Sequence, residues 1–230
     1  MKHCYSILAN IALLCLIVTG SAGQTQDSLI PIHHLTYDIL YNQAFHCPSV
    51  VEWSLEAWHL GRASSQPHRS FMQDMKEPRP RVRTQDYTNS GFHRGHLCPA
   101  GDRGGRYDFW FDTFYMTNVA PMKPTLNTGA WKNTEDECRA MVRTGCELDI
   151  LVIPLFIDSI APTFSDRSIH VPSHFYKSIS CTRHFGHCVR WLLRNTDDTQ
   201  DYRQCTITAD SAERLLKGVA TSCTYPYIQP

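Results

Sequence analysis

Residues 148–157, LDILVIPLFI, form the one long apolar run beyond the first 23 residues of this 230-residue chain. A run of this length is typical of a buried β-strand, and the proline at position 154 interrupts it. We therefore expect the fold to contain a sheet built around this segment.

The elements expected around this strand mix helices and strands irregularly, which favours the α+β class with a mainly antiparallel sheet flanked by helices. Residues 61–90 are rich in Pro, Ser and charged side chains and predict a long loop, and long loops in compact domains are usually functional. The other expected elements are a strand over 91–96 ending in a turn at 99–101, a helix over 125–143 with Gly145 just past its end, strands near 169–179 and 188–194, and an amphipathic helix near 209–219.

The N-terminus has the pattern of a secretory signal peptide. Met1-Lys2-His3 precedes an apolar stretch over 7–18 that is too short to span a bilayer, and the small residues of 19–23 suit a cleavage site. We predict a signal peptide over residues 1–23, a single domain over 24–230, a secreted or periplasmic location, and no membrane association after cleavage.

Cysteine usage agrees with export. Two of the ten cysteines fall in the expected signal peptide, and the remaining eight predict disulfide bonds whose pairing the sequence leaves open. Two of them enclose two histidines in the segment Cys181, His184, His187 and Cys188, which are zinc ligand types. Their spacing is unlike that of the common zinc fingers, and export favours disulfides.

Overall charge does not indicate a polyanionic partner, because removal of Lys2 leaves 21 basic against 22 acidic residues. The charge is unevenly distributed, however. Between positions 62 and 106 nine basic side chains face four acidic ones, which is an excess of five. Such a cluster either attracts phosphates or is a solvated loop.

The stretch 91–103, GFHRGHLCPAGDR, is too polar for a core. On a strand Arg94 and His96 share one face, with Gly95 between them. Histidine is the side chain best suited to take a proton near neutral pH, and arginine binds phosphate as a fork. A second stretch, FYMTNVAPMKPTLNTGAWKNTEDECR over 114–139, places Trp131, Glu135 and Arg139 at intervals of four, on one flank of a helix.

Together these two stretches resemble the motifs of the DNA/RNA non-specific endonucleases, which belong to the ββα-metal (His-Me finger) nucleases. His93-Arg94-Gly95-His96 is similar to the family's Asp-Arg-Gly-His, and 117–139 is similar to its S/T-N-x-x-P-Q, L-N-x-G-x-W, Glu and Arg series. The resemblance extends over about residues 35–222. It implies a ββα-metal fold and a sugar-non-specific endonuclease that hydrolyses DNA and RNA, and the signal peptide and cysteines add that this enzyme is secreted and disulfide-stapled.

The resemblance also implies roles for individual residues. His96 is the general base that activates water, Asn127 is the direct protein ligand of a divalent metal, Mg²⁺ with Mn²⁺ as the alternative, and Glu135 acts near its water shell. Arg94, Arg139 and Arg69 contact the scissile or flanking phosphates, and Asn118 positions the site.

These roles are chemically consistent. Mg²⁺ keeps several waters, so one amide ligand and a substrate phosphate suffice. On one straight helix Asn127 and Glu135 would lie about 12 Å apart. Either Glu135 therefore acts through water or Asn127 sits on irregular backbone before Gly129.

Three departures from the family pattern stand out: His93 replaces its Asp, Met122 replaces its Gln, and the strand at 148–157 lacks a common Gly. His93 supports the alternative function, a catalytically weakened nucleic-acid-binding module of the same fold. Because no base-reading motif is present, little sequence specificity is expected in either case.

Overall fold

The computed structural model describes residues 29–61, 70–157, 161–182 and 188–222. The expected signal peptide, Arg69, His184 and His187 lie outside the described residues. Within the described ranges, no helix has both the length and the apolar character that crossing a membrane requires.

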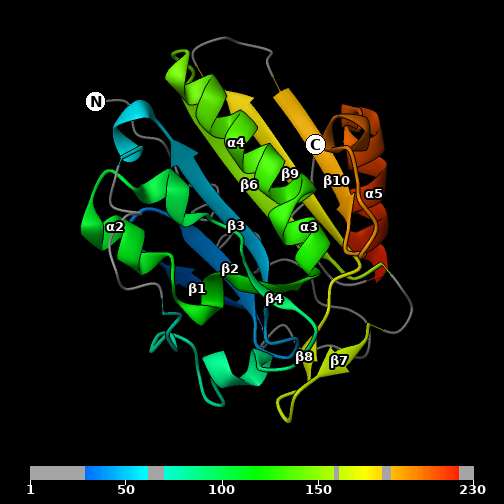
Figure 1. Cartoon of the computed structure of the whole chain (residues 1–230). Coiled ribbons are helices and arrows are strands. Elements are labelled where there is room, and N and C mark those ends of the chain that lie inside the picture. Colours follow the sequence, from blue (N-terminus) through cyan, green and yellow to red (C-terminus); the bar gives the residue numbers. More distant parts are fainter. Residues whose placement is uncertain (1–28, 62–69, 158–160, 183–187, 223–230) are drawn as a thin grey trace, which may run out of the picture.

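The core of the fold is a six-stranded sheet in the order β1-β2-β3-β6-β9-β10, with every neighbouring pair antiparallel. The expected apolar strand is β6, and it lies between β3 and β9 (Figure 1). These pairings confirm a mixed α and β fold with a mainly antiparallel sheet. The strands are β1 (Leu29–His33), β2 (Asp38–Asn42), β3 (Cys47–Leu55), β6 (Leu148–Leu155), β9 (His174–Cys181) and β10 (Cys188–Arg194).

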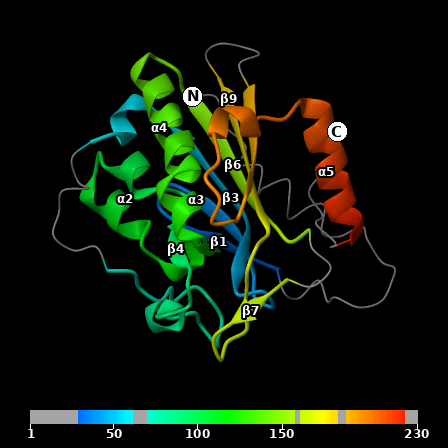
Figure 2. The same ribbon diagram turned by 45° about the vertical axis from the view of Figure 1, so that its right-hand side comes forward.

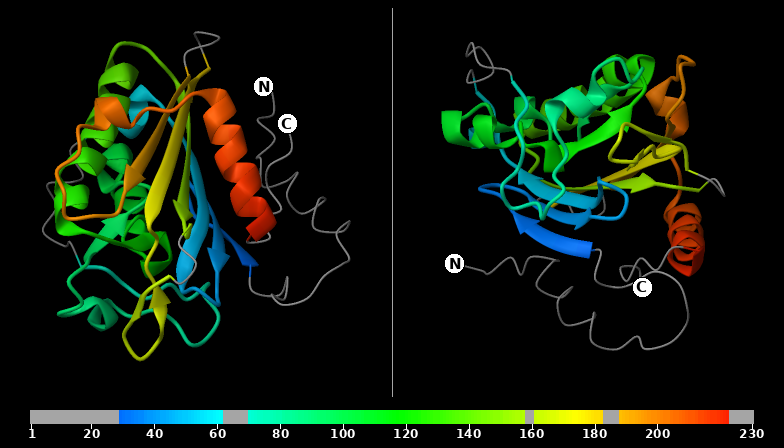
Figure 3. Two further views of the ribbon diagram at one scale, coloured as in Figure 1. Left: turned by 90° about the vertical axis from the view of Figure 1, so that its right-hand side faces the viewer. Right: turned by 90° about the horizontal axis from the view of Figure 1, so that it is seen from below.

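Helices cover both faces of this sheet. The side chains of Ile150 and Val152 join the core beneath helix α4 (Ala130–Arg143), whereas Ile153 and Leu155 pack with Leu216 of helix α5 (Ala209–Ser222). Figures 2 and 3 show α4 and α5 on opposite sides of the sheet. Burial on both faces explains why β6 is an apolar run rather than an alternating one.

A small two-stranded sheet carries the first motif. Strand β4 (His93–His96) pairs antiparallel with β5 (Val119–Met122), so that His96 lies opposite Val119. Gly95 is required at this position, because a Cβ there would lie 2.8 Å from the Cβ of Met122. A 3₁₀ turn over Ala100–Arg103 and helix α2 (Tyr107–Asp112) follow.

The helix expected over 125–143 is divided in two, α3 (Pro124–Thr128) and α4. The break falls at Gly129, whose φ and ψ of −107° and −109° are not helical. A Cβ at this residue would lie 2.6 Å from the carbonyl oxygen of Thr125. The prediction of one continuous helix was therefore wrong. The irregular backbone that we considered for Asn127 lies two residues further on, at Gly129.

Other boundaries also differ from expectation. The strand expected over 169–179 is split into β8 (Ile169–His170), which pairs with β7 (Thr163–Phe164), and β9. The loop expected before β4 is confirmed over 70–90, where the only regular helix or strand is a 3₁₀ turn at Thr84–Tyr87. Among the seven cysteines that the structure describes, it forms no disulfide bond. The expected disulfide stapling stays a prediction.

Candidate active site

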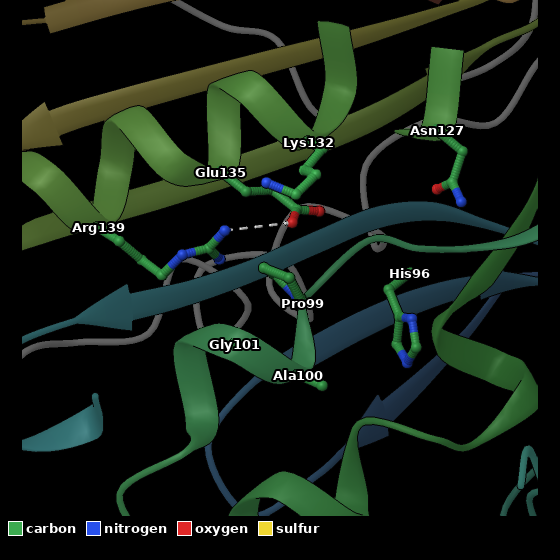
Figure 4. Close-up of a pocket in the computed structure, with 8 residues that line it drawn as sticks. All are labelled: His96, Pro99, Ala100, Gly101, Asn127, Lys132, Glu135 and Arg139. Atoms are coloured by element: carbon green, nitrogen blue, oxygen red, sulfur yellow. Dashed lines mark ion pairs between the residues drawn. The ribbon is translucent and has the colours of Figure 1, made fainter. Parts of the chain in front are cut away.

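The two motifs meet at one pocket of about 290 Å³. One wall comes from the end of β4 and the turn after it, and the other comes from α3 and α4 (Figure 4). The lining residues are His96, Pro99, Ala100, Gly101, Asn127, Lys132, Glu135 and Arg139.

His96 is held in place from several directions. Its ring packs against Phe71 and Phe114, at centroid distances of 4.7 and 5.0 Å. Its backbone carbonyl accepts a hydrogen bond of 3.1 Å from the indole N–H of Trp131. The ring atom Nε2 is buried without a hydrogen-bond partner among the described residues, which leaves Nδ1 as the nitrogen that can face the pocket. Burial lowers the pKa of His96 to about 4, so the ring is uncharged near neutral pH.

Asn127 projects from α3 towards the same space (Figure 4). Its amide Nδ2 lies 3.2 Å from Nδ1 of His93, the residue that replaces the family's Asp. If Nδ1 of His93 accepts this hydrogen bond, the Asn127 amide is oriented with its nitrogen towards His93. The carbonyl oxygen Oδ1 of Asn127 then remains available for another partner. His93 therefore supplies an acceptor at the position where an Asp carboxylate would also supply one.

Glu135 projects from the first turns of α4, and its side chain is 14% exposed. Burial raises the pKa of Glu135 to about 7, although the nearby cations Lys177 and Arg139 oppose this shift. Lys177 lies in the core below α4, where its ammonium donates to Oγ1 of Thr134 at 3.3 Å and lies 4.8 Å from the ring of Trp131. A buried cation therefore supports the carboxylate from beneath the helix.

Arg139 forms the far end of the pocket. Its guanidinium donates to the buried carboxylate of Asp102 at 2.9 Å and to Asp136 at 2.7 Å, and it lies 3.6 Å from Glu135. Burial alone would lower the pKa of Arg139, but these carboxylates raise it above its ordinary value. Gly101 makes room for the group, since a Cβ there would lie 3.0 Å from Nη1.

Two expected site residues do not line the pocket. Asn118 is fully buried, and its amide clamps the backbone N–H and C=O of Cys98 at 2.9 and 2.8 Å, so it positions the turn after β4. The guanidinium of Arg94 donates to the carbonyl of Thr84 and lies 5.7 Å from the centre of the Tyr87 ring. Arg69 lies outside the described residues.

Three contributors were missed by sequence reasoning. Asp102 anchors Arg139 and also accepts a hydrogen bond from Nε1 of Trp53 at 3.1 Å. Lys132 lines the pocket and Lys177 lies near Glu135. The sequence pattern predicts only a helix for Lys132 and a strand for Lys177, and it indicates no role in the site for either residue. Asp102 was the one with a visible signal, because an Asp-Arg pair between glycines ends the first motif.

The donor set of the pocket fits a hard divalent cation. The amide oxygen of Asn127 and the carboxylate of Glu135 are the oxygen ligands that Mg²⁺ accepts while keeping several waters. The described residues contain no cluster of three or more His, Cys, Asp or Glu side chains suited to a fully protein-ligated metal. The site therefore suits a metal that binds through one or two protein oxygens.

The fold brings an uncharged histidine, two side chains with oxygen ligands and a buried arginine together in one pocket, which is the arrangement of an enzyme active site. The model of the DNA/RNA non-specific endonuclease family matches residues 17–227, so the chain belongs to that family and is an endonuclease. Members of this family are metal-dependent, which implies a divalent metal ion.

Individual relatives agree. The chain is 34% identical to a nuclease from Nostoc sp. (strain PCC 7120 / SAG 25.82 / UTEX 2576), over 93% of this chain and 82% of that protein. It is 35% identical to mitochondrial endonuclease G of Bos taurus, over 42% of this chain and 36% of that protein. The fold is similar to that of EndoG in its crystal structure with EndoGI, with a TM-score of 0.71, 22% identity, and coverage of 93% and 90% of the two chains.

Proposed function

We propose that the protein is a secreted, Mg²⁺-dependent endonuclease that hydrolyses DNA and RNA with little sequence specificity, using His96 as its general base. The observation that carries the proposal is that His96, Asn127, Glu135 and Arg139 line one pocket although they come from two separate motifs. Family membership supplies the reaction class.

His96 would take the proton from the attacking water at Nδ1. The burial that keeps this ring uncharged also keeps the nitrogen lone pair available as an acceptor. The hydrogen bond from Trp131 to the His96 carbonyl holds the base in register with α4. Holding the base in a reactive geometry lowers the activation free energy, by several kcal/mol in well-oriented reactions.

Asn127 and Glu135 would hold the metal ion, Asn127 directly through Oδ1 and Glu135 through water. When bound, Mg²⁺ would neutralise charge that develops on the phosphate and on the leaving oxygen. His93 would orient the amide of Asn127 by accepting from Nδ2. The break at Gly129 places the two oxygen donors on separate helices, so they are not fixed at the spacing of one straight helix.

Arg139 would donate hydrogen bonds to the phosphate, because Asp102 and Asp136 hold its guanidinium in a fixed position at the wall of the pocket. Arg94 would contact the phosphate only after its side chain leaves the carbonyl of Thr84. Arg69, which lies outside the described residues, would contact a flanking phosphate.

The N-terminal segment and the cysteines support export. Residues 1–23 would act as a signal peptide and leave a single domain over 24–230. In an oxidising compartment Cys146 and Cys181 are suited to pairing, because the two thiols lie within hydrogen-bonding reach of each other. N-terminal sequencing and non-reducing peptide mapping of the exported protein test the cleavage site and the pairing.

Cleavage assays test the proposed chemistry. Plasmid DNA and single-stranded RNA are incubated with the protein in Mg²⁺ or EDTA, beside His96→Ala and the surface control His33→Ala, whose side chain is 66% exposed. We expect cleavage of both substrates, loss with EDTA, loss in His96→Ala, and retention in His33→Ala. A folded wild-type protein that shifts DNA in a gel but shows no metal-dependent cleavage would instead support the binding-module alternative.

A further inference from the structure

A second cavity, of about 550 Å³, lies outside the catalytic pocket. Its lining residues are Gln73, Arg79, Pro80, Arg81 and Arg167. They come from the segment before β4 and from the turn between β7 and β8, which lie together at the lower end of the molecule in Figures 1 and 2. An ion pair of 3.1 Å between Arg167 and Asp86 joins these two segments.

Little of the positive charge in this cavity is neutralised. Arg79 is exposed and has no hydrogen bond or ion pair to any residue that the structure describes. Within the described part of the chain, Arg81 donates only to the neutral carbonyls of Glu77 and Met75, at 2.6 and 3.3 Å. Arg167 pairs with Asp86, which also pairs with a further arginine, Arg83, and Arg83 lies 3.6 Å from a second carboxylate, that of Asp166. Three guanidinium groups around one hollow therefore retain a net positive charge that an anion would stabilise.

The cavity is connected to the catalytic pocket by an extended segment. Phe71 packs on the ring of His96, and its backbone carbonyl accepts a hydrogen bond of 2.9 Å from Thr84. Gln73 follows Phe71 by two residues, and residues two apart in extended chain lie about 7 Å from each other. Met72 between them is fixed by backbone hydrogen bonds to Phe114 and Met116, at 3.0 and 2.8 Å. A polymer lying across His96 would therefore meet the arginines within a short distance.

We propose that this cavity is a second phosphate-binding site, which holds the backbone of a polynucleotide substrate away from the bond that is cut. The inference rests on the proposed function. Arginine forks match phosphate oxygens, and the amide of Gln73 adds a donor and an acceptor for a neighbouring sugar or base. The ligand class is a phosphodiester chain that extends beyond the scissile phosphate, and a dinucleotide is too short to occupy both sites.

The test compares the full-length wild-type protein with Arg79→Gln and with Arg79→Gln/Arg167→Gln. The matched control is Arg143→Gln, which removes an exposed arginine at the last residue of α4, outside the cavity. Values of kcat/KM are measured in Mg²⁺ on a 40-nucleotide single strand and on a dinucleotide. Binding of the 40-mer is measured in EDTA by fluorescence anisotropy over a range of salt concentrations, and thermal unfolding checks each fold.

We expect the double variant to lower the ratio of 40-mer to dinucleotide kcat/KM on the order of ten-fold, and Arg143→Gln to leave it unchanged. The slope of log K against log salt should fall by about 0.7 for each phosphate of a single strand that the variant no longer neutralises. An unchanged ratio and slope in an active wild-type background overturn the inference, as does an equal decrease on the dinucleotide. A wild-type protein that cleaves neither substrate refutes the proposed function instead.

Discussion

His34 forms a buried ion cluster whose removal should destabilise the protein severely. Its side chain has no solvent exposure, Nε2 lies 3.1 Å from Asp74, and Nδ1 lies 3.3 Å from Asp112. The ring stacks on Tyr37 at 4.5 Å. His34→Phe would keep this stacking and remove both charged contacts. Each charged hydrogen bond is worth about 1.5–3 kcal/mol, and breaking a buried pair costs about 3–5 kcal/mol, so we expect a loss of about 3–5 kcal/mol.

Urea unfolding followed by tryptophan fluorescence measures this loss, and thermal unfolding should show a decrease in Tm of about 10 °C. His33→Phe is the matched control, because His33 is the chain neighbour, is 66% exposed, and pairs with Asp38 at 2.8 Å. An exposed pair contributes less than about 1 kcal/mol. If His34→Phe loses no more than His33→Phe, the cluster does not stabilise the fold and the reasoning is wrong.

The stabilisation by His34 should also depend on pH. Burial alone would lower the pKa of His34, but its hydrogen bonds to Asp112 and Asp74 raise it above the usual 6.5. Because the folded-state pKa is raised, the contribution is complete below pH 6.5 and is lost as pH rises through the folded-state value. Burial would raise the pKa of Asp74, but bonds from His34 and Thr117 lower it below 3.8, so its contribution is lost only in stronger acid. The wild-type advantage over His34→Phe should therefore shrink above neutrality, and an advantage constant up to pH 10 would contradict this.

Three further substitutions test the catalytic pocket. Asp102→Asn removes the carboxylate that holds Arg139. We expect the rate of plasmid cleavage to fall at least about ten-fold and the free energy of unfolding to fall by about 3 kcal/mol. Activity within two-fold of wild type would contradict the anchoring role. Gly129→Ala places a Cβ 2.6 Å from a backbone carbonyl, so urea unfolding should show a loss of about 1–3 kcal/mol, and an unchanged midpoint would mean that the break relaxes freely. His93→Ala removes the acceptor for Asn127, so the affinity for Mn²⁺ measured by calorimetry should fall about five-fold. His93→Asp supplies an acceptor again and should restore this affinity. Equal affinities in the two variants would exclude the orienting contact.

The sequence was sufficient to predict the elements with strong local signals. The apolar run became β6, the segment from 188 to 194 became β10 with the expected bounds, and the helix near 209 became α5. Strands β1 to β3 were not predicted. β1, β2 and β3 pair with one another as neighbouring hairpins, but the position of β3 beside β6 depends on pairing over a long sequence separation, which local periodicity does not encode.

The site was predicted in composition and only partly in geometry. His96, Asn127, Glu135 and Arg139 do line one pocket. Strand alternation alone put Arg94 beside His96, but tertiary contacts with Thr84 and Tyr87 direct its guanidinium elsewhere. The buried Lys177 could not be predicted, since lysine is rarely buried and its position depends on tertiary contacts with Thr134, Trp53 and Trp131.

Two contacts tie helix α4 to the segment that carries the base: the indole of Trp131 to the carbonyl of His96 at 3.1 Å, and the guanidinium of Arg139 to Asp102 at 2.9 Å. Both begin on the helix that also carries Glu135. These contacts fix the position of the base relative to this carboxylate, so the pocket loses its shape when the helix separates from the sheet. Denaturant should therefore abolish cleavage and tertiary structure at the same concentration. Residual activity then measures the fraction of the protein that is folded.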